Sequence, residues 1–490
     1  MKYLNKTNLL KLKNISSRYP LNELFYKVLE KLRNPYRNYG SEYVKYIPQE
    51  EELREQAKTC FPLMPKVSIV VPTYETDELF LQQMIDSVIN QTYGNWELCI
   101  ADGSQSDKVE QNIRNNYAKE KRIVYRRLEK NAGISENTNQ GFEIATGEYI
   151  ALLDHDDLLT PNAVYEMVKC LNETEADFIY SDEDKVSFDL KEYSDPHFKL
   201  DFNLELLLGN NYICHFLMVS AELLKKAGGL DSRYDGAQDF EFVLRCSRLA
   251  KGIAHVPKVL YHWRVHPAST AGNTNSKLYA YEAGKRAVED FIVQQGWQGT
   301  VTMTRDLGFY RTRYVVPENL VIGVVIQESE NGKQKLKQQR EKINPRIKCQ
   351  LEAEAVELKV KLIWDYDNSR KVDYILLLNP DTKQIKPQSL SILLGSCHRQ
   401  DVAMVGARAV AASKLVHCGY WGKEEKRVPR FTGLPRRFKG YYRRAFLPVE
   451  VDDCGNDMAV LKVEALQKTG YRIITDPAAE VTIIVANSGR

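Results

Sequence analysis

Residues 67–75 read Val67-Ser68-Ile69-Val70-Val71-Pro72-Thr73-Tyr74-Glu75. A short run of β-branched apolar residues that ends at a proline is typical of a strand buried in a parallel sheet. Working outward, we expect further strands over residues 96–101, 122–127 and 149–153, with helices over residues 79–90, 107–118 and 135–145. Strands that alternate with helices in this way predict a doubly wound α/β sheet.

Polar motifs follow three of these strands, at residues 72–75, 102–104 and 154–157. In a doubly wound sheet, ligands bind beyond the carboxyl ends of the strands. The coincidence predicts a binding site at this edge of the sheet.

The last motif places the carboxylates Asp154, Asp156 and Asp157 at the end of an apolar strand. Crowded like charges cost free energy unless something neutralises them. A divalent cation with oxygen ligands, Mg²⁺ or Mn²⁺, would do so, and such ions are commonly shared with substrate phosphates. The alternative is an acidic turn in which Asp157 caps the next helix, which Thr160-Pro161 are expected to start.

The whole chain has 490 residues, which favours about three domains. Its 68 Lys and Arg against 65 Asp and Glu argue against a protein built to coat nucleic acid. The nine cysteines are scattered and read as reduced thiols of a cytoplasmic protein. We expect no signal peptide at the polar, basic N-terminus and no membrane span, because no window of 18 apolar residues occurs.

Three segments are expected. Residues 1–64 form a basic helical extension, residues 65–316 the main α/β domain, and residues 317–490 a second, partial copy of it. The extension could lie on an anionic membrane surface as a peripheral contact, or it could be a solvated helix packed on its own protein.

The second copy is inferred from strand-like runs over residues 320–326, 374–378 and 402–406. It lacks the Pro-Thr-Tyr turn, and the chain ends soon after Gly470, so we expect an inactive partial copy. Residues 436–444 interleave cations with aromatic rings, as membrane-interface segments do. A solvated loop and a site for single-stranded nucleic acid are the alternatives, although nothing else in the chain supports nucleic acid.

The ordered segments VSIVVPTYET, ADGSQSD, NAGISENTNQG, GEYIALLDHDDLL, IYSDEDK, GAQDFEFVLRC and VLYHWRVHPAST together resemble the family-two inverting glycosyltransferases. These have the GT-A fold, a Rossmann-like mixed sheet flanked by helices. The similarity covers residues 65–300 and is nearest to bacterial enzymes of surface-polysaccharide synthesis.

The resemblance implies roles for individual residues. Asp239 would be the general base, Asp156 and His262 would bind the metal, and Arg264 would face the diphosphate. The remaining positions would line the nucleotide-sugar pocket: Pro72, Thr73, Tyr74, Glu75, Asp102, Asn131, Ser135, Asn139 and Asp154. As an alternative, Asp239 could merely cap a helix, since anions favour helix N-termini.

The chemistry behind the first role is simple. A sugar hydroxyl is a poor nucleophile, so a carboxylate must accept its proton during attack on the anomeric carbon. One base opposite one leaving group implies single displacement with inversion. The predicted function is therefore transfer of a sugar from a UDP- or dTDP-sugar to a growing, lipid-linked cell-surface glycan, at the cytoplasmic face of the membrane.

Two other functions were weighed. A non-catalytic scaffold subunit would have no chemical reason to keep Asp102, Asp154, Asp156 and Asp239 together. A sugar-nucleotide pyrophosphorylase would need a glycine-rich basic loop after the first strand, which residues 72–75 do not provide.

Overall fold

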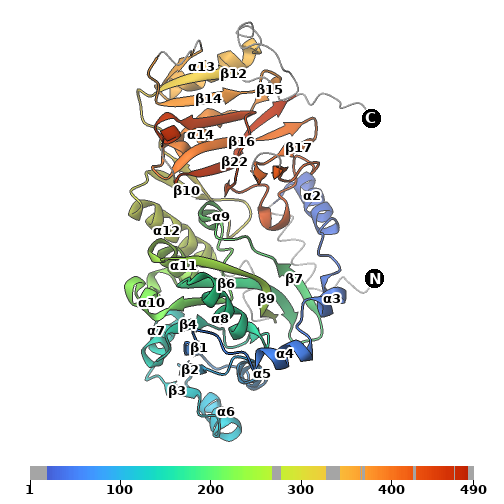
Figure 1. Ribbon diagram of the computed structural model, residues 1–490, viewed down its shortest axis with the longest axis vertical. Coiled ribbons are helices and arrows are strands. Elements are labelled where there is room, and N and C mark those ends of the chain that lie inside the picture. The colour runs from blue at the N-terminus through green and yellow to red at the C-terminus, as the bar shows by residue number, and fades with distance from the viewer. Residues whose placement is uncertain are drawn as a thin grey trace.

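Two sheets are stacked along the long axis of the protein, and the N-terminal helices run down one side of them (Figure 1). The computed structural model describes residues 19–266, 278–326, 343–364, 366, 370–422, 426–467 and 470–483. Residues 1–18 and most of the glutamine-rich stretch before residue 343 lie outside this range, so the basic side chains of the first 18 residues are not placed.

The first sheet has the strand order β3-β2-β1-β4-β8-β6-β9-β5, with β7 paired to β6. Strand β1 is parallel to β2 and β4, whereas β8 runs antiparallel to both β4 and β6. The strands are β1 (Val67–Thr73), β2 (Trp96–Asp102), β3 (Ile123–Arg127), β4 (Tyr149–Leu152), β5 (Leu158–Leu159), β6 (Phe178–Ser187), β7 (Tyr193–His197), β8 (Leu217–Ser220) and β9 (Ile253–Val265). This is a mixed GT-A sheet, so the predicted fold class is confirmed.

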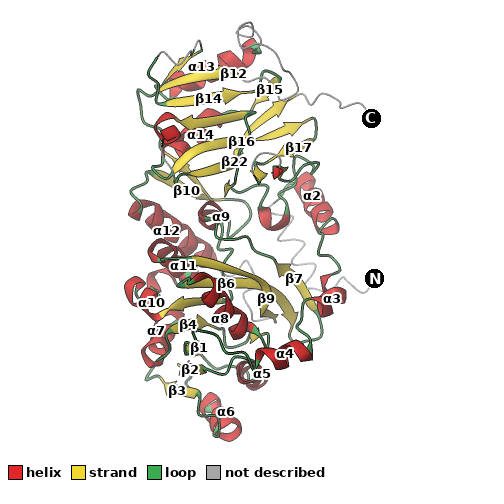
Figure 2. Ribbon diagram, in the orientation of Figure 1, coloured by secondary structure: helices red, strands yellow, loops and turns green. Residues whose placement is uncertain are grey.

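Helices cover both faces of this sheet (Figure 2). Apolar side chains of α5 and α8 pack on one face, and those of α11 and α12 on the other. The helices are α5 (Glu78–Ile89), α6 (Lys108–Tyr117), α7 (Ile134–Ile144), α8 (Ala163–Thr174), α9 (Leu204–Gly209), α10 (Ala221–Ala227), α11 (Gln238–Leu249) and α12 (Leu278–Gln294). One start differs from expectation: α8 begins at Ala163 after Asn162, because Thr160 and Pro161 still belong to the preceding turn.

The second sheet repeats the first almost strand for strand. Its order is β13-β12-β14-β21-β16-β22-β15, with β17 paired to β16. Each neighbouring pair has the direction of its counterpart: β12 is parallel to β13 and β14, β21 is antiparallel to β14 and β16, and β22 is parallel to β16. The strands are β12 (Val321–Ile326), β13 (Lys361–Ile363), β14 (Tyr374–Leu378), β15 (Thr382–Ile385), β16 (Val402–Ala411), β17 (Lys414–His417), β21 (Met458–Lys462) and β22 (Arg472–Ile483).

Two parts of the first domain have no counterpart among the described residues of the second. No strand pairs beyond β13 as β3 does beyond β2. The connection from β8 to β9 contains α11, which carries Asp239, whereas that from β21 to β22 contains only the short 3₁₀ helix Val463–Gln467 in its described part. The missing helix therefore belongs before β22, not after Gly470 as expected from the sequence.

The second domain also contains α13 (Pro345–Glu357), α14 (Ser389–His398) and short elements after β17: β18 (Tyr420–Trp421), β19 (Val428–Pro429), a 3₁₀ turn (Tyr441–Arg443) and β20 (Val449–Glu450). A hairpin of β10 (Gly299–Met303) and β11 (Tyr310–Tyr314) leads into it. The two domains share a buried ion pair, in which Glu205 of α9 binds Arg399 at 2.7 Å and Arg472 at 3.2 Å.

The N-terminal extension contains α2 (Leu21–Leu32), α3 (Tyr39–Glu42), the 3₁₀ turn Tyr43–Lys45 and α4 (Glu50–Gln56). It meets both domains at Asp306 in the turn of the hairpin, which is almost wholly buried. Asp306 binds Lys27 of α2 at 2.7 Å and Lys439 of the second domain at 2.5 Å. Although burial raises the pKa of Asp306, the charge of Arg443 together with these lysine contacts holds it far below its usual value.

Residues 436–444 do not form a solvated loop. Phe438 is buried, Tyr441 donates to the carbonyl of Pro196, and Arg444 donates to the carbonyl of Phe198 at 2.5 Å. Tyr442 stacks flat on His197, with ring centroids 3.6 Å apart. The segment therefore joins the second domain to β7 of the first.

Candidate active site

The acidic loop between β4 and β5 is organised by its one buried member, Asp157. Its Oδ2 accepts the Tyr261 hydroxyl at 2.6 Å, and its Oδ1 accepts the backbone N–H of Arg264 at 2.7 Å. Burial, together with Asp156 and Asp154, raises the pKa of Asp157 well above its usual value. Asp157 thus shapes the loop, while the Asp154 side chain stays 48% exposed and that of Asp156 20% exposed.

Arg264 supports the same loop from beneath. Its side chain is 0% exposed, and its guanidinium donates to the Asp156 carbonyl at 2.6 Å and to Gln83 at 2.7 Å. It also lies over the Phe80 ring, 4.4 Å from the centroid. This position corrects the expectation of an arginine that faces a diphosphate, because the whole side chain is enclosed.

His262, in β9, and His266, just after that strand, have different partners. His262 is hydrogen-bonded through Nδ1 to Asp184 at 2.5 Å and through Nε2 to the Tyr43 hydroxyl at 3.0 Å. Both ring nitrogens are engaged, which contradicts its assignment as a metal ligand. His266 instead places Nε2 2.8 Å from Oδ2 of Asp156. The sequence could not separate them, because side chains four apart on a strand share a face.

Asp239 lies in the first turn of α11 and faces the same site. Asn211 donates to its Oδ2 at 2.8 Å, and Cys214 Sγ lies 3.9 Å from that oxygen. Burial raises the pKa of Asp239, while His215 and the backbone N–H of Phe240 partly offset the rise.

His215 contacts the acidic loop and is linked to Asp239 through Cys214, whose Sγ contacts both residues. Its Nε2 is 3.7 Å from Oδ2 of Asp154 and 3.7 Å from Cys214 Sγ. The ring stacks on Tyr261, with centroids 4.6 Å apart. Asp239 and Asp154 both act electrostatically on this imidazole, so the predicted base and the acidic loop belong to one site.

A buried carboxylate behind His215 completes the site, and sequence reasoning left its role open. Glu183 of β6 accepts the backbone N–H of His215 at 3.1 Å and lies 3.3 Å from both its Nδ1 and Lys199 Nζ. Lys199, His197 and His215 more than offset the effect of burial and hold the pKa of Glu183 well below its usual value. Only the pairing of distant segments reveals this cluster.

Glu183, Cys214 and His215 are close enough together to suggest a metal site. The same side chains also form buried ion pairs, since Lys199 Nζ and His215 Nδ1 each lie 3.3 Å from Glu183. Burial disfavours the imidazolium, but Cys214, Asp154 and Glu183 outweigh it and raise the pKa of His215 well above its usual value. We call Glu183, Lys199 and His215 the buried ion-pair network.

Hydrogen bonds join the loops that are expected to bind the nucleotide. Asp102 is fully buried and accepts the hydroxyls of Tyr125 at 2.8 Å and Thr73 at 3.0 Å. Glu75 accepts the backbone N–H groups of residues 105 and 106 at 2.8 and 2.9 Å. Pro72 and Thr73 are buried, whereas Tyr74 is 44% exposed. Of these predicted positions, Tyr74 and Glu75 are exposed, and of the two Tyr74 has the aromatic ring that can stack on a base.

The predicted residues of α7 and its approach serve to fix that helix. Ser135 donates to Asp235 at 2.5 Å, and Asn139 exchanges two hydrogen bonds with the backbone of Leu230. Asn131 accepts from the backbone N–H of Gly133 at 3.0 Å. These bonds attach α7 to the loop that leads into α11, so they position Asp239 indirectly.

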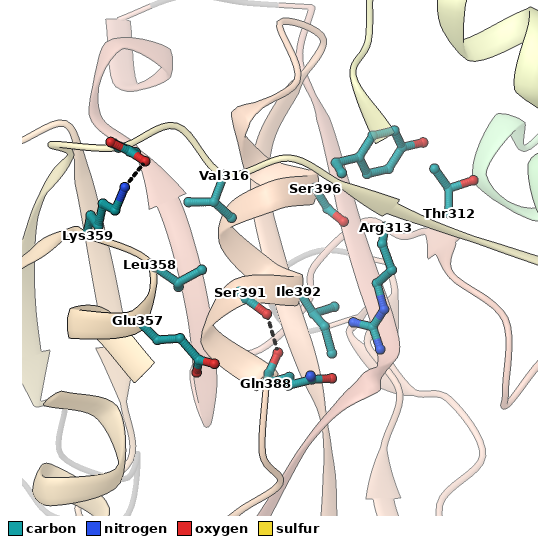
Figure 3. A pocket seen from close by; sticks show the side chains of 12 residues that line it. Thr312, Arg313, Val316, Glu357, Leu358, Lys359, Gln388, Ser391, Ile392 and Ser396 are labelled. Atoms are coloured by element: carbon teal, nitrogen blue, oxygen red, sulfur yellow. Dashed lines mark hydrogen bonds and ion pairs between the residues drawn. The ribbon is translucent and has the colours of Figure 1, made fainter. Parts of the chain in front are cut away.

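A pocket of about 410 Å³ lies away from this edge, where the segment after β11 meets α14 (Figure 3). Ser391 donates to the Gln388 carbonyl there, and Lys359 pairs with Glu318. None of the predicted site residues lines it.

Comparisons with known proteins assign the chain to a family. The family model for glycosyl transferase family 2 matches residues 68–228. The chain is 30% identical over 230 residues to the uncharacterized glycosyltransferase RT0329 of Rickettsia typhi, which covers 45% of this chain and 70% of that protein. The chain belongs to the family-2 glycosyltransferases.

Two further similarities have sequence identities below 30%. The O-antigen biosynthesis protein RfbC of Myxococcus xanthus is 29% identical over 388 residues, or 72% of this chain and 30% of that protein. The solved structure of S. aureus TarS 1–349 is 19% identical, with a TM-score of 0.38 over 46% of this chain and 65% of that one. The chain spans less than a third of the length of the first curated relatives it matches. Among the described residues, no helix is long and apolar enough to cross a membrane.

The Glu183→Gln variant tests the buried ion-pair network. Losing this carboxylate leaves Lys199 and His215 without their main counter-charge, which we expect to cost roughly 3–5 kcal/mol of stability. The measurement is the midpoint of urea unfolding of the full chain, followed by circular dichroism. Glu192→Gln, in the exposed turn between β6 and β7, is the control and should change stability by about 0.5 kcal/mol or less. Equal midpoints for the two variants would contradict the network.

Proposed function

We propose that this protein is an inverting glycosyltransferase that moves a sugar from a nucleotide-sugar to a hydroxyl of a cell-surface glycan. The observation that carries the proposal is a chain of contacts around His215: its Nε2 lies 3.7 Å from Asp154 of the acidic loop, and Cys214 Sγ lies 3.7 Å from that nitrogen and 3.9 Å from the candidate base Asp239. A base and a cluster of oxygen ligands in one site are what direct displacement at an anomeric carbon requires.

Asp239 accepts the proton of the acceptor hydroxyl as that oxygen attacks the anomeric carbon. The helix N-terminus stabilises its carboxylate, while Asn211 fixes its orientation. His215 carries positive charge beside Asp154 and Asp239, which limits the repulsion between them. A single displacement inverts the anomeric centre, and the nucleoside diphosphate leaves.

The acidic loop and His266 fit a divalent cation. Asp154 and Asp156 retain exposed carboxylates, and His266 contacts Asp156, giving the oxygen and nitrogen donors that Mg²⁺ or Mn²⁺ accept. When bound, the cation would neutralise charge on the leaving diphosphate. Arg264 and Asp157 hold the loop in shape for it.

For the donor we propose a UDP- or dTDP-sugar, with Tyr74 stacking on the base beside the tied loops after β1 and β2. The acceptor we propose is a lipid-linked surface polysaccharide, supported by the name of the O-antigen relative. The second domain, without a helix equivalent to α11, would be inactive in transfer. We place its boundary near residue 317, and that of the extension near residue 64.

The extension is suited to a peripheral contact at the cytoplasmic membrane face. Phe25, Val28 and Leu32 of α2 are 59%, 53% and 56% exposed and share one side of the helix. Lys31 and Arg33 lie next to this stripe in the sequence. An apolar stripe flanked by cations is the pattern of helices that lie in an anionic bilayer surface.

The Asp239→Asn variant tests the base. It should lower the rate of sugar transfer at least about 100-fold, because an amide cannot accept the proton. Nucleotide affinity, measured by calorimetry, should stay nearly unchanged. In the wild type, kcat should fall as the pH drops through the raised pKa of Asp239, so the acid limb should lie above the usual aspartate range. Retained turnover in the variant would overturn the assignment.

Equivalent turns of the two sheets provide a test variant and a matched control variant for the proposed metal site. Asp156 follows β4, and Asp381 occupies the corresponding turn between β14 and β15. Asp156→Asn should lose most transfer activity and require more Mn²⁺, because the site loses a charged ligand, whereas Asp381→Asn should behave as wild type. Transfer rates are measured across a Mn²⁺ titration after treatment with a chelator. Full activity in chelator, or equal losses in both variants, would refute the site.

The membrane contact is tested with Phe25→Ser/Leu32→Ser. Removing two side chains, each worth about 1.5–3 kcal/mol on full burial, should weaken cosedimentation with phosphatidylglycerol vesicles about tenfold or more. Val293→Ser/Val356→Ser, which changes exposed valines of α12 and α13, is the control. If both variants sediment as the wild type does, α2 is not the contact.

A further inference from the structure

A second cavity, of about 950 Å³, lies where the extension, the hairpin and the second domain meet. One wall is the side of α2 opposite its exposed apolar stripe. The others are the β10–β11 hairpin and segments of the second domain. The lining residues are Glu23, Tyr26, Lys27, Glu30, Thr302, Met303, Thr304, Arg305, Arg311, Lys386, Arg408, Arg436, Arg437, Phe438, Lys439, Phe446 and Glu480. None of them belongs to the candidate active site.

The lining is strongly basic, with eight lysines and arginines against three glutamates. All three glutamates already have ion-pair or hydrogen-bond partners within the protein. Glu480 pairs with both Arg408 and Arg436, Glu23 pairs with Arg305 at 2.6 Å, and Glu30 accepts the backbone N–H groups of residues 439 and 440. The cavity therefore has a net positive charge that its own carboxylates do not balance.

Two cations in the lining have no carboxylate within ion-pair distance in the described part of the chain. Arg437 lies over the ring of Tyr26, 5.4 Å from its centroid. Lys386 lies near Arg408 and Arg311, and burial followed by these cations lowers its pKa despite the influence of Glu480. Both groups would gain from an anion in the cavity.

Aromatic rings lie among the cations. Phe438 meets Tyr26 edge to face with centroids 6.0 Å apart, and Phe446 lies under Arg311 and Lys439. A simple anion would not use these rings. The cavity is also larger than a phosphate group needs, so it has room for an organic part attached to the anion.

We propose that this cavity binds a phosphorylated ligand through a phosphoryl or pyrophosphoryl group. Arginine forks match phosphate oxygens, and cations on several walls suit an anion that presents oxygens in several directions. The ligand would bridge the extension, the hairpin and the second domain. A lipid headgroup and a soluble phosphate compound share this chemistry.

The test uses the full chain and inorganic pyrophosphate, with calorimetry at low ionic strength in EDTA to suppress metal-dependent binding at the catalytic site. Lys386→Ala/Arg437→Ala should bind pyrophosphate about tenfold more weakly than wild type. Lys383→Ala/Lys414→Ala removes the same charge from exposed positions of β15 and β17 and should bind as wild type does. Absence of pyrophosphate binding to wild type, or equal affinities in the two double variants, would overturn the proposal.

Thermal unfolding without ligand checks that the variants fold. Arg437 is exposed at the rim, so Arg437→Ala alone keeps the test decisive if the double variant does not fold. That variant should still weaken pyrophosphate binding severalfold, and unchanged affinity would count against the site.

A second arm identifies the source of the phosphate. The wild type is bound to vesicles of phosphatidic acid, and pyrophosphate is added. Release that depends on Lys386 and Arg437 supports the site and assigns it to a lipid headgroup. Pyrophosphate binding that depends on these residues, without release from vesicles, supports the site and assigns it to a soluble ligand.

Discussion

The structure depends on balancing negative charge at one edge of the first sheet. Five carboxylates lie there, those of Asp154, Asp156, Asp157, Glu183 and Asp239. Like charges in a partly dry site repel strongly. Buried basic side chains offset this negative charge. Lys199 and Arg264 are enclosed completely, and the pKa of His215 is raised well above its usual value. Because each cation comes from a different segment, charge balance also fixes how β6, β9 and the connection before β8 are placed.

Comparison of the two sheets distinguishes the features that the fold requires from those that the proposed chemistry requires. The second domain keeps the strand order and directions of the first, since these follow from its apolar strands. Its described residues contain no helix equivalent to the one that carries Asp239, and its acidic turn is reduced to Asn379 and Asp381. His417 and Asp457 pair at 2.7 Å near the corresponding edge, so polar residues persist there without the full charged network. The outer surface of the second domain keeps a structural role. Its Tyr442 stacks on His197, and His197 in turn contacts Glu183.

Much of this could be predicted from the sequence because strands and the turns after them are local patterns. Residues 67–71 predicted β1, although the strand continues through Pro72 to Thr73, and the turns after β1, β2 and β4 were placed at one edge correctly. Apart from the start of α8 and the position of the missing helix, the failures are contacts between distant segments. No local sequence pattern shows that the Arg264 side chain is enclosed. Nor does one show that His262 is hydrogen-bonded to Asp184 and Tyr43, or that Glu183 contacts His215. Period-two alternation gives the face of a side chain, but its partner is set by strand pairing and register.

The same distinction explains the basic segments. Their composition favours contact with an anion, and for residues 436–444 the sequence leaves a membrane interface, a solvated loop and a site for single-stranded nucleic acid open. In the structure its aromatic rings are used to join domains, while Arg436, Arg437 and Lys439 turn into a cavity closed by α2. The cations are therefore gathered by folding from segments 400 residues apart. Such a cavity exists only when the extension and the second domain are both in place, so an anion bound there would favour the joined arrangement over any in which they separate.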